Sequence, residues 1–231
     1  MSSTVRSPER GAAMLLTLTL LVMAGIAFAL DSLLLKSSRV KDDARAFRQL
    51  SQAKEALLSY AGANDRVAQL GRLPCPFLGN IADYDSDGTS GACGGDNLLA
   101  LGLLPWKTLG LPNLRDGSFA PIVYAVAGAY KLGSTTATPP FPTGNLTLNN
   151  SGDHVAFLIA PGDPLSNQTR LLSSTLISQR TQFLEKVAAT PDTDFELRKI
   201  DLASSTPVAN RFNDRLLAVS QNDLIYAVTR N

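Results

Sequence analysis

The chain contains 231 residues, 45% of them hydrophobic, and its 21 lysines and arginines almost balance its 20 aspartates and glutamates. A near-neutral charge without a run of basic residues argues against nucleic-acid binding. The sequence has a single histidine, His154, and neither a Gly-x-Ser-x-Gly motif nor a Gly-x-x-x-x-Gly-Lys-Ser/Thr phosphate loop. We therefore predict that the protein is not an enzyme.

The first predicted element is an uncharged apolar stretch, residues 12–30, which follows a short leader containing Arg6 and Arg10. As a helix it would measure roughly 28 Å, close to the hydrocarbon thickness of a bilayer, so the stretch predicts a membrane-spanning segment. Three interpretations are open. The stretch is a secretory signal with its cleavage site at Ala27-Phe28-Ala29, a permanent single-pass anchor, or a segment cut on its cytoplasmic side and retained as a helix.

The residues after this stretch favour the third interpretation. Neither proline nor glycine occurs between Asp31 and Ala61, and apolar residues recur there at the spacing of one helix face. A secretory signal has no need to continue into an amphipathic helix. We predict one helix over 12–61, apolar in its first half and amphipathic in its second, whose apolar face holds Val40, Ala44, Phe47, Leu50, Ala53, Ala56, Leu57 and Ala61.

The start of this helix resembles the class III leader of type IV pilins and type II secretion pseudopilins, on the run Arg10-Gly11 followed by Ala12-Ala13-Met14-Leu15-Leu16. In that family a peptidase cuts after the glycine and methylates the new N-terminus. The resemblance implies a cut between Gly11 and Ala12, with Ala12 methylated. Most members carry glutamate at the fifth mature position, where this chain has Leu16. The chain is therefore more similar to minor subunits, such as the K-type tip pseudopilin and the X-type minor pilin.

The resemblance also implies a function, a location and partners. It implies a minor pilin or pseudopilin of a type IV pilus or type II secretion-like fibre, with residues 1–11 as the cleaved leader and residues 62–231 as a globular head. The protein would sit in the bacterial inner membrane as a single-pass protein, with the N-terminus cytoplasmic and the head periplasmic, and then enter the fibre. Its partners would be other subunits, the prepilin peptidase, the inner-membrane assembly platform and the membrane.

A loop rich in glycine, proline and aspartate follows the helix and contains Cys75 and Cys93, the only two cysteines of the chain. Both lie beyond the membrane segment, so both should reach an oxidising compartment. We predict one disulfide between them, which would stabilise the fold by roughly 3 kcal/mol in the chain-entropy model. A zinc site is a poor rival, because two cysteines and one distant histidine fall short of four ligands.

The same loop contains the spacing Asp83-x-Asp85-x-Asp87-Gly88, which is typical of the opening of a calcium-binding loop. Position 12 of an EF-hand would be Gly94, which cannot ligate, so a complete EF-hand is excluded. Asp96, brought round by the disulfide, could supply the missing carboxylate. Calcium bound by Asp83, Asp85, Asp87 and Asp96 is one hypothesis, and a solvated acidic turn is the other.

The rest of the chain predicts an α+β fold, in which the long helix packs on a head with an antiparallel sheet and a disulfide-closed loop. β-Branched and apolar runs predict the strands, and Ser220 with Asp223 predicts the start of the last helix. The predicted strands cover 122–127, 154–160, 197–202 and 216–220, and the predicted helices cover 171–187 and 221–229.

An alternative function is open beside the fibre subunit. It is a membrane-anchored or secreted periplasmic binding module that depends on calcium.

Overall fold

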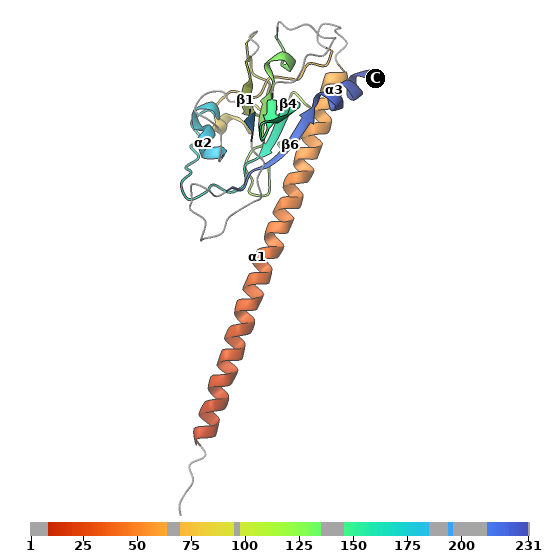
Figure 1. Ribbon diagram of the computed structural model, residues 1–231. Coiled ribbons are helices and arrows are strands. Elements are labelled where there is room, and N and C mark those ends of the chain that lie inside the picture. The colour runs from red at the N-terminus through yellow and green to blue at the C-terminus, as the bar shows by residue number, and fades with distance from the viewer. Residues whose placement is uncertain are drawn as a thin grey trace, which may run out of the picture. The chain divides into compact units, whose positions relative to one another are not determined.

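A computed structural model describes residues 9–63, 70–94, 98–134, 146–184, 194–195 and 212–230 (Figure 1). The chain divides into two compact units, Met1–Asp43 and Ala44–Asn231. Helix α1 (Glu9–Gly62) has 54 residues and crosses the boundary between these units.

Within the second unit, α1 buries one stripe of small and aliphatic side chains. Its members are spaced by three or four residues, the repeat that places side chains on one face of a helix. The stripe differs from the predicted apolar face, because Ala44 and Phe47 are exposed, Phe47 by 51%. Alanine at three of its five positions gives the stripe small side chains, and the stripe passes through Ala46 rather than the larger Phe47. It comprises Ala46, Leu50, Ala53, Leu57 and Ala61.

Strand β4 (Ser151–Ala160) is the centre of the sheet. One of its edges pairs with β6 (Arg215–Ser220), and the other pairs with β3 (Leu146–Leu148) and then with β2 (Val123–Val126). Strand β1 (Ala100–Leu103) extends the sheet beyond β2, and β5 (Asp194–Phe195) extends it beyond β3. The last six residues of β4 and all of β2 are buried, so this part of the sheet forms the core. The predicted strands over 122–127, 154–160 and 216–220 are thus confirmed.

The predicted fold class needs two corrections. The sheet is mixed rather than antiparallel, because β3 and β5 run parallel. Among the described residues, no helix has a stretch long and apolar enough to cross a membrane.

This finding contradicts the predicted membrane-spanning half at 12–30. It also contradicts the predicted location, a single-pass protein of the bacterial inner membrane with a cytoplasmic N-terminus and a periplasmic head.

The helix predicted over 171–187 is also corrected. Only η4 (Ile177–Gln179) and α2 (Arg180–Phe183) are helical among its described residues. The side-chain amide of Gln179 bonds both the backbone N–H and the carbonyl of Leu171, so the chain folds back on itself instead of continuing as a helix. Residues 185–187 and the strand predicted over 197–202 lie outside the described residues.

The last helix, α3 (Gln221–Thr229), begins as predicted with a capping box between Ser220 and Asp223. The Asp223 carboxylate has a second partner, because Lys54 Nζ donates to Asp223 Oδ2 at 2.8 Å. Lys54 also donates to the carbonyl of Ala218 at 3.0 Å. One ammonium group on α1 thus binds the end of β6 and the start of α3, and we call this cluster of Lys54, Ala218, Ser220 and Asp223 the helix junction.

We predict that Asp223→Ala lowers the free energy of unfolding by about 1–2 kcal/mol, because it removes the cap and the ion pair together. Urea unfolding at neutral pH measures this loss. Asn222→Ala, which changes an exposed neighbour on α3, is the matched control and should have little effect. Equal losses in the two variants would contradict a specific role for the junction.

The same junction predicts a pH dependence. Desolvation raises the pKa of Asp223, but the hydrogen bonds from Lys54 and Ser220 outweigh it and lower the pKa below 3.8. A lowered carboxylate pKa stabilises the fold above the unfolded value, and that stabilisation is lost as the pH falls through the folded value. We expect Asp223→Asn to remove this part of the acid sensitivity below about pH 4, as measured by thermal unfolding.

Candidate functional site

The acidic loop, residues 80–88, is organised around a short 3₁₀ turn, η2 (Ile81–Asp83). The backbone carbonyl of Asp83 accepts from the N–H groups of Ser86 and Asp87, at 3.1 and 2.8 Å. The side chains of Asp83, Asp85 and Asp87 are all exposed. The loop is therefore a compact turn that presents its carboxylates to solvent.

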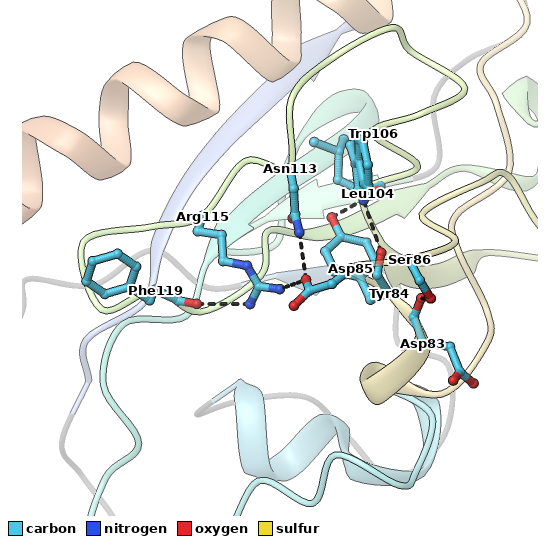
Figure 2. A network of polar contacts seen from close by, with 9 residues as sticks. All are labelled: Asp83, Tyr84, Asp85, Ser86, Leu104, Trp106, Asn113, Arg115 and Phe119. Atoms are coloured by element: carbon cyan, nitrogen blue, oxygen red, sulfur yellow. Dashed lines mark hydrogen bonds and ion pairs between the residues drawn. The ribbon is translucent and has the colours of Figure 1, made fainter.

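Gly88 closes the acidic loop under Trp106. Its φ of +53° favours glycine, and a Cβ built there would overlap the indole ring. The indole Nε1–H donates to the Tyr84 carbonyl at 3.2 Å (Figure 2). The hydroxyl of Tyr84, which is buried, donates to the carbonyl of Leu104 at 2.8 Å. Burial raises the pKa of Tyr84 well above its ordinary value, so this phenol stays protonated.

Asp85 is bound by two side chains from a distant part of the sequence. Its Oδ1 accepts from Asn113 Nδ2 at 2.6 Å and forms an ion pair with Arg115 (Figure 2). The guanidinium of Arg115 also donates to the carbonyl of Phe119 at 3.0 Å. The acidic loop is thereby connected to the turn at residues 115–121.

The other two carboxylates of the motif also have partners within the protein. Asp83 accepts from Asn80 Nδ2 at 3.4 Å, and Asp87 accepts from Thr89 Oγ1 at 2.5 Å. In the part of the chain that the structure describes, no three His, Cys, Asp or Glu side chains are grouped closely enough to hold a metal ion. Asp96 lies outside the described residues. Calcium binding by this loop stays a prediction.

The predicted disulfide is confirmed, and it links Cys75 to Cys93 with a Cα–Cα distance of 5.7 Å. Polar contacts attach both ends of the segment it closes to the core, one of them through Pro74, the residue before Cys75. Buried Lys131 donates to the carbonyl of Cys93 at 2.7 Å, and the hydroxyl of buried Tyr124 donates to the carbonyl of Pro74 at 3.1 Å. These contacts hold the cysteine-containing loop, and with it the acidic loop, against the sheet.

Phe119 lies in the turn beside Arg115 and is held in an uncommon conformation. Its φ is +62°, a region that bulky side chains rarely adopt, yet its side chain is 66% exposed. The carboxylate of Asp116, which is buried, accepts from the N–H groups of Ser118 and Ala120 at 2.9 and 2.8 Å and so fixes the turn. The guanidinium of Arg45 lies over the Phe119 ring, 4.6 Å from its centroid.

A pocket of about 420 Å³ lies between this turn and the acidic loop, a size typical of sites for small ligands. Its lining is mostly apolar, with charged groups at a few positions. Neither this pocket nor the roles of Arg115 and Phe119 could be predicted from the sequence, because the only local signal is the Asp116-Gly117 turn. The lining residues are Ile81, Ala82, Asp85, Arg115, Ser118, Phe119, Ala120, Pro121, Pro164, Arg170, Leu172 and Phe183.

The N-terminal part of α1 presents a second candidate surface. Eight of its large apolar side chains are each more than half exposed within the described structure. The hydroxyls of Thr17 and Thr19 bond the carbonyls of Met14 and Leu16, at 3.0 and 2.9 Å, so these two polar groups are satisfied within the helix. We call this set the apolar surface of α1, and it comprises Met14, Leu16, Leu18, Leu20, Leu21, Val22, Met23 and Ile26.

Gly11 and Ala12, the predicted processing residues, lie in the first turns of α1. The surroundings of their side chains are not among those that the structure describes.

Comparison with known proteins identifies no relative. No family model matches the chain, and no curated protein or solved structure is significantly similar to it.

We predict that Gly88→Ala destabilises the protein more than Gly110→Ala does. Both glycines have positive φ, at +53° and +67°, so both variants carry the conformational cost of about 1 kcal/mol. Only Gly88 lies against Trp106, whereas a Cβ at Gly110 would meet nothing within 4 Å. Overpacking should add about 1–3 kcal/mol to the first variant, as measured by urea unfolding. Equal losses would show that Trp106 does not constrain the acidic loop.

Proposed function

We propose that the protein is a structural subunit of a pilin-like fibre, of the minor pilin or pseudopilin type. In this proposal the apolar surface of α1 is covered by the corresponding helices of other subunits. The single observation that carries the proposal is the exposure of this surface, since each of its eight side chains is at least 54% exposed.

The energy of this surface is large enough to drive association. Burial of a Leu-sized side chain contributes about 1.5–3 kcal/mol, so eight of them amount to on the order of 10 kcal/mol. Large exposed apolar patches on a protein mark interaction sites. Part of this energy is lost to the entropy cost of association, which each copy of the subunit must overcome.

The chemistry of the surface supports helices of like composition as its partners. Residues 12–30 contain no charged side chain, and Thr17 and Thr19 satisfy their hydroxyls within the helix. A charged partner would lose hydration against this surface without gaining an opposite charge. Uncharged helices bury it without that cost.

Leu16 supports the minor class of subunit. The apolar side chain at this position gives the helix no carboxylate with which to pair a neighbouring N-terminal amine. A subunit of this kind could end or begin a fibre, where one neighbour is missing. Processing between Gly11 and Ala12 by a prepilin peptidase, and contact with an assembly platform, are part of the proposal.

Mass spectrometry of the chain co-expressed with a prepilin peptidase tests the processing. We expect the mature protein to begin at Ala12 and to carry one added methyl group, and we expect Gly11→Leu to keep its leader. An unprocessed chain, or one that begins at Leu30 after cleavage as a secretory signal, would contradict the proposal.

Co-assembly tests the fibre function separately. We expect Leu20→Asp to be processed normally but to be lost from fibres or from complexes with other subunits, because the carboxylate would be buried in an apolar interface. Leu20→Met preserves the volume and the apolar character, and we expect it to assemble. Equal incorporation of both variants would show that the apolar surface of α1 is not an assembly interface.

A further inference from the structure

His154, the only histidine of the chain, sits at an irregular position of β4. Its register partners are Leu146 of β3 and Ser220 of β6, and the pairing with β6 shifts between His154 and Ala156. Its imidazole contacts the ring of Phe157, with 5.2 Å between centroids. His154 is therefore held across from Ser220, the capping residue of the helix junction.

The surroundings of this imidazole favour its neutral form. Nδ1 is enclosed and has no hydrogen-bond partner in the described structure, and the same holds for Oδ1 of the adjacent Asp153. A neutral imidazole can leave one nitrogen as an unused acceptor, whereas an imidazolium carries a donor on both nitrogens. Protonation would leave an enclosed N–H without an acceptor unless nearby groups rearranged.

The charged groups whose charges act on the His154 imidazole come from three elements. They are Asp153 of β4 itself, Asp223 of α3 and Lys54 of α1. The register partners from β3 and β6 are uncharged. Because Lys54 already pairs with Asp223, a cation on His154 would compete with Lys54 for that carboxylate and would repel the Lys54 ammonium.

We propose that His154 is an acid-sensitive latch on the helix junction. When His154 is neutral, Lys54 holds Asp223 and the end of β6, and α3 is fixed to α1. When His154 is protonated, it disturbs the Lys54–Asp223 pair and α3 loosens. The proposal is independent of whether the chain assembles into fibres.

The direction of the pH effect follows from desolvation, which lowers the pKa of His154 below 6.5, assisted by Lys54 and opposed by Asp153 and Asp223. With a lowered folded pKa, the unfolded chain binds the proton more readily than the folded chain does. The stabilisation is therefore present in full above pH 6.5 and declines below it, until the pH reaches the folded pKa. One proton limits the decline of the folding equilibrium constant to about tenfold per pH unit.

An NMR titration of the protein measures the latch directly, because a single histidine gives a single imidazole signal. We expect a midpoint below 6.5, which Lys54→Met raises and Asp223→Asn lowers. A midpoint at or above 6.5, or a midpoint that neither variant moves, would overturn the proposal.

Hydrogen exchange of the α3 amides tests the structural consequence. We expect their protection to fall between pH 6.5 and 5.0, by up to about tenfold per pH unit after correction for the intrinsic exchange rate. In His154→Gln, which cannot be protonated, this fall should disappear. An identical fall in His154→Gln would overturn the latch, and the two variants of the titration provide an answer if His154→Gln does not fold.

Discussion

The ammonium of Lys54 connects three elements of the second unit. It joins α1 to the Ala218 carbonyl at the end of β6 and to the Asp223 carboxylate at the start of α3. The stripe that begins at Ala46 buries α1 among the core residues, but hydrophobic burial is non-directional and does not by itself set the rotation of a helix. The two hydrogen bonds of Lys54 are directional, and they specify which side of α1 faces the end of β6 and the start of α3. Strand β4 connects β6 to the rest of the sheet, because one of its edges pairs with β6 and the other pairs with β3 and β2.

Helix α1 uses apolar residues in two different ways. In the second unit, one side of α1 is buried and the opposite side is polar or exposed, as expected of a helix that covers a core. Between Met14 and Ile26 the described apolar side chains are exposed on every side. An apolar helix without a polar side requires partners all round. This difference, rather than any feature of a cleft, leads to the proposal of an assembling subunit.

Short sequence patterns predicted some features of the head and of the candidate site, but not the contacts between distant residues. Cysteine spacing predicted the disulfide, and the capping box at Ser220 was visible in four consecutive residues. The acidic motif located an exposed loop but did not reveal what its carboxylates bind. Asp85 meets Arg115, 30 positions along the chain, and nothing near either residue indicates this pair. The exposed Phe119 was equally hidden, because its conformation depends on the buried carboxylate of Asp116.

By itself, the sequence determined the helical period of α1, three of the strands, the cap of α3 and the disulfide, because each depends on residues close in the chain or on the two cysteines alone. Only the tertiary structure decided which side of α1 is buried, since Ala46 and Phe47 are apolar neighbours in the sequence and only Ala46 is buried in the core. It also decided the partners of Asp85, Lys54 and His154. Lys54 and Asp223 are 169 positions apart, and contacts at such separations arise only when the whole chain has folded.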